Sequence, residues 1–140
     1  MAQGRIRVLC VDDHWIVRQG IAALIGEEPD MEVVGSAATG EEAEVLFRKS
    51  RPDVVLMDLQ LPGQSGLDTI RAIRRKAPEA RIIVLTMYQG EEDIFRALRD
   101  GAATYMLKDS LFDDLANLIR DVHAGVARLP PEVEARLEER

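Results

Sequence analysis

Residues 8–15 read VLCVDDHW, a stretch in which four apolar residues end abruptly on two adjacent carboxylates. A strand that is apolar at every position suits a parallel sheet with helices covering both faces. The segment 54–58, VVLMD, repeats the pattern and ends on Asp58. Both segments therefore predict buried strands with acids at their carboxyl ends.

Five β-rich runs alternate with five segments of helical spacing along the chain. The expected strands are 6–11, 32–37, 54–57, 82–85 and 104–107, and apolar residues at helical spacing fall within 17–25, 43–47, 67–73, 94–98 and 115–122. Thr39 with Glu42 forms a capping-box pattern, and Ser110 with Asp113 forms a weaker one. This order predicts an α/β fold with a doubly wound, five-stranded parallel sheet.

The composition is that of one ordinary globular domain. The chain has 140 residues, of which 46% are hydrophobic and 31% charged. Its formal net charge of −7 disfavours direct binding to nucleic-acid phosphates. Cys10 is the only cysteine, so we expect a buried thiol and a reducing compartment. No apolar run exceeds the five residues 21–25 and no secretory signal is evident, so we expect a cytoplasmic protein with no membrane association.

Polar side chains stand at the ends of four expected strands. They are Asp12 and Asp13 after the first strand, Asp58 after the third, Thr86 after the fourth and Lys108 after the fifth. Ligand sites of such sheets lie at the carboxyl ends of the strands, so these groups should converge. Two carboxylates about 4 Å apart repel by about 4 kcal/mol at an effective dielectric near 20, so a cation should lie among them. Hard oxygen ligands without a Cys or His array favour Mg²⁺.

Asp58 is the expected nucleophile of this site. It begins the loop DLQLPGQSG, in which Pro62, Gly63 and Gly66 favour a turn that leaves the carboxylate accessible. Carboxylates can form aspartyl phosphates, and a metal ion with Lys108 would neutralise the charge on a transferring phosphoryl group. Asp58 is therefore predicted to accept a phosphoryl group, and the Thr86 hydroxyl would contact one of its oxygens.

Four motifs, in this order, resemble the receiver domain of two-component response regulators: VDDHW, VVLMDLQLPGQSG, IIVLT and GAATYMLKD. The resemblance spans residues 5 to about 126 and implies the flavodoxin-like (CheY-like) strand order 2-1-3-4-5. It implies that Asp58 accepts phosphate from a sensor histidine kinase. It also implies that Mg²⁺ is held by Asp12, Asp13, Asp58 and the backbone carbonyl of Gln60.

The same resemblance implies a conformational switch. Thr86, Tyr105 and Lys108 would propagate the change that phosphorylation causes, and the side chains of Gln60 and Tyr88 would tune the lifetime of the phosphate. The protein would not be a classical enzyme, although it would catalyse its own phosphorylation and dephosphorylation. A homodimer on phosphorylation is a further expectation.

The motifs DDH, QLPGQSGLD and KD resemble the NarL/FixJ-type subfamily of transcriptional regulators. Residues 1–126 would then be the receiver domain, and 127–140 would be a linker, or the start of a linker helix, toward an absent output domain. No helix-turn-helix follows, so we expect a truncated chain whose full form binds DNA only through that missing domain. A stand-alone receiver acting as a protein–protein adaptor is the alternative.

Three residues depart from the subfamily pattern. Trp15 and Asp109 stand where similar proteins often have proline, and Thr104 stands where glycine is frequent. A cis bond before a residue other than proline costs about 3–4 kcal/mol, so the Lys108–Asp109 bond is expected to be trans.

Other interpretations explain parts of the same pattern. An adjacent Asp pair could simply cap a helix. A phosphohydrolase of the haloacid-dehalogenase kind needs a second acid two residues past the nucleophile, where this chain has Gln60. A flavodoxin-like cofactor carrier needs a phosphate cradle in the first loop, where Asp12 and Asp13 would repel the ligand. His14 is expected to influence the rim of the site rather than to ligate a metal.

Overall fold

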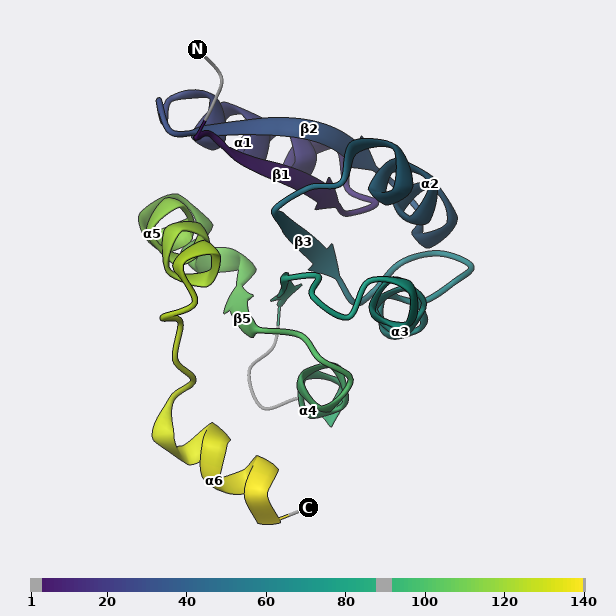
Figure 1. The fold of residues 1–140 in the computed structure, drawn as a ribbon, viewed down its shortest axis with the longest axis vertical. Coiled ribbons are helices and arrows are strands. Elements are labelled where there is room, and N and C mark those ends of the chain that lie inside the picture. Colours follow the sequence, from purple (N-terminus) through teal and green to yellow (C-terminus); the bar gives the residue numbers. More distant parts are fainter. Residues whose placement is uncertain (1–3, 88–91, 140) are drawn as a thin grey trace.

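The computed structural model describes residues 4–87 and 92–139 and shows a central sheet between two layers of helices (Figure 1). The strands are β1 (Ile6–Val11), β2 (Met31–Ala37), β3 (Val54–Asp58), β4 (Ile82–Thr86) and β5 (Thr104–Leu107). Their order is β2-β1-β3-β4-β5, and all four neighbouring pairs are parallel. The predicted fold class and strand order are therefore confirmed.

Helices cover both faces of this sheet. They are α1 (Trp15–Gly26), α2 (Gly40–Ser50), α3 (Gly66–Lys76), α4 (Glu92–Arg99), the short 3₁₀ helix η1 (Lys108–Ser110), α5 (Leu111–Ala124) and α6 (Pro131–Glu139). The first and fifth helices pack on one face, whereas α2, α3 and α4 lie on the other (Figure 1). None of the helices in the described part of the chain is both long and apolar enough to cross a membrane.

The two helical layers explain why the strands are apolar at successive positions. In β1, Leu9 and Val11 belong to the core on the α2 and α3 side, while Val8 and Cys10 belong to the core on the α1 and α5 side. Burying each such aliphatic side chain contributes about 1.5–3 kcal/mol. Cys10 is a buried free cysteine, as expected, and burial raises the pKa of its thiol to about 12.

The two predicted helix caps have different outcomes. Thr39 accepts a hydrogen bond from the backbone N–H of Glu42 at 3.1 Å, so the first prediction is confirmed. The Ser110 prediction is wrong, because no side-chain hydrogen bond caps α5 there. Ser110 ends the 3₁₀ helix η1 and donates to its neighbour Asp109 instead. Ser65 caps α3 by accepting from the N–H of Asp68 at 3.1 Å, which the sequence analysis missed.

The last described helix returns to the body of the domain. After Gly125, which has a positive φ of 77°, the chain runs to α6. The guanidinium carbon of Arg136 lies 4.1 Å from the centroid of the Phe95 ring in α4, and Val133 is buried. Residues 127–139 therefore contact the body of the domain instead of leaving it as a detached tail.

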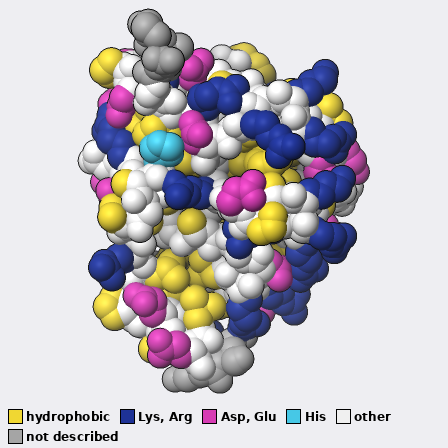
Figure 2. All heavy atoms as spheres, viewed as in Figure 1, with side chains coloured by type: hydrophobic (Ala, Val, Ile, Leu, Met, Phe, Trp, Pro, Cys, Tyr) yellow, Lys and Arg dark blue, Asp and Glu magenta, His cyan; other side chains and the backbone are white. Residues whose placement is uncertain are grey.

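Basic side chains gather on one side of the molecule despite the negative net charge. Figure 2 shows this group on the side where α2 and α3 lie. The last turns of α2, α3 and α4 are basic, with Arg48, Lys49, Arg74, Arg75, Lys76, Arg96 and Arg99. Cations near a helix C-terminus interact favourably with the helix dipole, which gives this distribution a structural cause.

Candidate functional site

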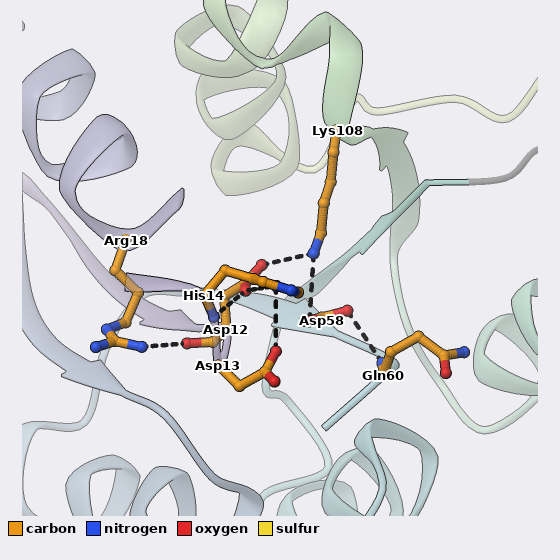
Figure 3. A network of polar contacts seen from close by, with 7 residues as sticks. All are labelled: Asp12, Asp13, His14, Arg18, Asp58, Gln60 and Lys108. Atoms are coloured by element: carbon orange, nitrogen blue, oxygen red, sulfur yellow. Dashed lines mark hydrogen bonds and ion pairs between the residues drawn. The ribbon is translucent and has the colours of Figure 1, made fainter. Parts of the chain in front are cut away.

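The acid and amine groups from three strand ends meet in one pocket (Figure 3). The Lys108 amine lies 2.8 Å from Oδ2 of Asp12 and 3.3 Å from Oδ2 of Asp58. Asp12 follows β1, Asp58 is the last residue of β3, and Lys108 follows β5. Both acids are buried, and the Lys108 side chain is only 8% exposed. The parallel sheet thus brings together groups that lie 46 and 50 residues apart in the chain (58 − 12 and 108 − 58).

The pocket keeps an excess of negative character. Oδ2 of Asp12 and Oδ2 of Asp58 are buried, and apart from the ion pairs with Lys108 neither accepts a hydrogen bond within the described structure. Burial raises the pKa of Asp58, and this outweighs the hydrogen bond from the Gln60 N–H at 3.0 Å. Burial opposes the charged form of Lys108, but its contacts with the two acids are stronger and its pKa is raised. Lys108 is therefore a positively charged ammonium group that compensates only part of the negative charge of the surrounding carboxylates.

Asp13 and His14 complete the acidic group at the more exposed side. Nδ1 of His14 lies 3.1 Å from Oδ1 of Asp12 and 3.2 Å from Oδ1 of Asp13. Asp12, Asp13, His14 and Asp58 each bring one potential ligand atom to within 4.8 Å of the others. The buried oxygens without hydrogen bonds and the three hard carboxylates fit a divalent cation such as Mg²⁺. His14 is at the rim, as expected, and its ring contacts both acids.

The acid doublet does not cap the following helix. The N-cap residue of α1 is His14, and no acidic residue lies in the first turn. Arg18 of α1 instead donates from Nη1 to the backbone carbonyl of Asp12 at 2.7 Å (Figure 3). This contact could not be predicted from the sequence, because every residue type offers the same carbonyl acceptor.

The loop after Asp58 is shaped by a close backbone approach. The Gly66 N–H donates to the Leu59 carbonyl at 3.2 Å, and a Cβ at Gly66 would lie 2.3 Å from the Asp58 carbonyl oxygen. Any larger residue at this position would displace the loop or the strand end. Leu59 and Leu61 are buried, so the loop is anchored on both sides of Gln60.

A cavity of about 350 Å³ opens beside the acids. Asp58, Thr86 and Lys108 line it together with His14, Leu59, Gln60, Met87 and Asp93. Thr86, the last residue of β4, is thus placed beside Asp58, as the sequence analysis predicted, and it is mostly buried. The Lys108–Asp109 bond is trans.

Tyr105 lies elsewhere. It is half-buried, packs against the core on the α2 and α3 side, and lines a second cavity of about 390 Å³ with Arg128 and Pro130 of the linker. The structure does not bring it into the Asp58 cavity. Tyr88, predicted to tune the phosphate lifetime, lies outside the described residues.

Comparisons with known proteins agree with one another. Residues 8–120 match the family model described as the response regulator receiver domain. The chain is 37% identical to the transcriptional regulatory protein LiaR of Bacillus subtilis over 94% of this chain and 63% of LiaR. It is 40% identical to the response regulator GacA of Pseudomonas aeruginosa over 94% of this chain and 62% of GacA. The chain therefore spans less than two thirds of these relatives.

Solved structures give the same result. A LuxR-family two-component response regulator from Aurantimonas sp. superimposes with a TM-score of 0.85 and 38% identity, covering 96% of each chain. The response regulator domain of Thermotoga maritima CheB gives a TM-score of 0.80 and 30% identity, covering 91% of this chain and 99% of that one.

Proposed function

Because this chain belongs to the response-regulator receiver family, we propose that it is a signalling switch in which Asp58 accepts a phosphoryl group from a sensor histidine kinase. The observation that carries the proposal is the Lys108 amine, 3.3 Å from the Asp58 carboxylate beside an open cavity. Response regulators are signalling proteins rather than classical enzymes, so the chemistry of this site serves to set a conformational state.

The proposed reaction transfers one phosphoryl group. A carboxylate oxygen of Asp58 attacks the phosphorus of a phosphohistidine, the P–O bond forms as the P–N bond breaks, and the electron pair of that bond returns to the kinase imidazole. Lys108 neutralises charge on the phosphoryl oxygens, and the Thr86 hydroxyl donates to one of them. The residues proposed to hold Mg²⁺, which supplies further charge neutralisation when bound, are Asp12, Asp13, Asp58 and the Gln60 carbonyl.

The output of the switch is proposed to pass through the β5 side of the fold. Thr86 responds to the phosphoryl group, and Tyr105 transmits the change to the surface around the second cavity. Tyr105 lines this cavity together with Arg128 and Pro130 of the linker. A shift from 1:99 to 99:1 between two states requires about 5.5 kcal/mol of differential stabilisation. The side chains of Gln60 and Tyr88 are proposed to adjust the lifetime of the phosphate.

We propose residues 1–126 as the receiver domain and 127–140 as the linker toward a DNA-binding output domain. Supporting this division, the family match ends at residue 120, and LiaR is by name a transcriptional regulatory protein. Phosphorylation would promote a homodimer, which would present two output domains to DNA.

Intact-mass spectrometry with acetyl phosphate and Mg²⁺ tests the acceptor. The wild-type chain should gain one phosphoryl group, and Asp58→Asn should gain none. Asp68→Asn is the matched control, because Asp68 is an exposed aspartate outside the pocket and should leave labelling unchanged. Equal labelling of wild type and Asp58→Asn would refute the assignment.

A further inference from the structure

We propose that His14 is a metal ligand of the acidic site and that it shifts the preference of this site from Mg²⁺ toward transition-metal ions such as Mn²⁺. This inference rests on the cation site of the proposed function and specifies which ions that site selects. It assigns His14 a role that the sequence analysis did not.

The donor atom of His14 lies close to both neighbouring acids. Ligand atoms bound to one ion at about 2.0–2.2 Å lie about 3 Å apart. Nδ1 of His14 lies 3.1 Å from one carboxylate oxygen of Asp12 and 3.2 Å from one of Asp13. Nδ1 therefore already lies at the separation expected of ligands to a common ion from a carboxylate oxygen of each acid.

The backbone of His14 is held beside the acids. The His14 N–H donates to Oδ1 of Asp12 at 2.8 Å, and His14 is the N-cap residue from which α1 begins. Its side chain is 63% exposed, so the ring can bind an ion at the rim without being forced into a buried position. Preorganisation of this kind lowers the entropy lost when a ligand set forms.

Carboxylate charge remains uncompensated in the network of Figure 3. Three carboxylates, from Asp12, Asp13 and Asp58, face the ammonium group of Lys108, whereas Arg18 is directed at a backbone carbonyl. Apart from the ion pairs with Lys108, the buried Oδ2 atoms of Asp12 and Asp58 accept no hydrogen bond within the described residues. A divalent ion at this place would compensate the carboxylate charge that one lysine leaves unbalanced.

The chemistry of the ligand set then determines which ions are favoured. Carboxylates alone suit Mg²⁺, whereas imidazole is a good ligand for transition metals and a poor one for Mg²⁺. One imidazole beside carboxylates should therefore raise the affinity for Mn²⁺ while leaving that for Mg²⁺ nearly unchanged. The competing explanation is that Nδ1–H only donates to the two acids, and it predicts no effect of His14 on ion preference.

Electron spin echo spectroscopy of bound Mn²⁺ tests the inference directly, without any phosphoryl donor. The wild-type protein should show ¹⁴N modulation from a coordinated imidazole, and His14→Gln should lose it. The Mn²⁺ affinity is measured from the signal of the free ion and should fall about tenfold in His14→Gln. Even residues that only hydrogen-bond to metal ligands change metal affinity by about 10–100-fold when mutated. Mg²⁺ affinity, from competition, should change less than twofold.

His123→Gln is the matched control, because His123 is the other histidine and lies exposed near the end of α5. It should keep both the modulation and the affinities of the wild type. Bound Mn²⁺ without ¹⁴N modulation, or an unchanged Mn²⁺ to Mg²⁺ preference in His14→Gln, would overturn the role of His14 and leave the proposed carboxylate site intact. Absence of any bound divalent ion in the wild type would overturn both.

Discussion

Replacing Lys108 with methionine should destabilise the fold in metal-free buffer. The Lys108 amine is paired with two buried carboxylates, at 2.8 Å from Asp12 and 3.3 Å from Asp58. Methionine keeps an unbranched apolar stem but removes the charge, so the loss isolates the ion pairs. Two acids would then remain buried without this partner.

The magnitude follows from those two distances. At an effective dielectric near 20, the two attractions are about 6 and about 5 kcal/mol before desolvation is subtracted. Removing one partner of a buried pair costs about 3–5 kcal/mol after that correction. Burial already raises the pKa of Asp58, so this acid can take up a proton and relieve part of the loss. We therefore expect a loss at the lower end of that range, about 3 kcal/mol at pH 7.

Urea unfolding followed by far-ultraviolet circular dichroism measures this change in the free energy of unfolding. Lys49→Met is the control, since Lys49 is exposed in the last turn of α2 and the change should stay within about 0.5 kcal/mol. Added Mg²⁺ should stabilise Lys108→Met more than the wild type, because it compensates the same acids. A Lys108→Met protein as stable as Lys49→Met in metal-free buffer would refute the reasoning.

Further predictions concern the acceptor, its loop, a helix cap and the last helix. Burial raises the pKa of Asp58 above its ordinary value of 3.8. The protonated carboxyl therefore contributes to the free energy of unfolding below pH 3.8, and this contribution should be lost as the pH rises through the raised pKa. Urea titrations at several pH values should show a smaller loss in Asp58→Asn. Gly66→Ala places a Cβ 2.3 Å from the Asp58 carbonyl oxygen, so it should cost about 1–3 kcal/mol in the same assay and slow phosphorylation by acetyl phosphate. Thr39→Ala removes the cap of α2 and should cost about 1 kcal/mol, with Thr39→Ser restoring most of it. Arg136→Ala removes the contact with Phe95, so amide hydrogen exchange in 131–139 should accelerate, and unchanged rates would contradict docking of α6.

Strand ends show where sequence reasoning was accurate and where it fell short. The expected strands 54–57 and 82–85 stop one residue before the observed ends of β3 and β4, at Asp58 and Thr86. The prediction places each polar residue just outside its strand. The sheet pairs Asp58 with Leu85 and Thr86 with Leu107, so the ladder extends to the site residues and fixes their backbones.

The contacts missed by sequence reasoning depend on distances through space. Examples are the Arg18 contact with the Asp12 carbonyl, the position of the His14 ring between two acids and the Arg136 contact with Phe95. Carbonyl acceptors are the same for every residue type, and the direction of a side chain depends on packing. Ser110 failed as a cap because the 3₁₀ helix before α5 fixes its backbone in a different conformation.

The fold class, the order of the elements and the polar groups at the carboxyl edge follow from the amino-acid sequence alone. Apolar periodicity reports which faces of a segment are buried, and the central parallel strands, covered by helices on both faces, are mostly apolar up to the polar residues at their carboxyl ends. The tertiary structure alone decided how near those groups lie, which ones remain uncompensated and where the last helix docks. Electrostatic energies vary with separation and burial, and both are set by packing between segments that are distant in the chain.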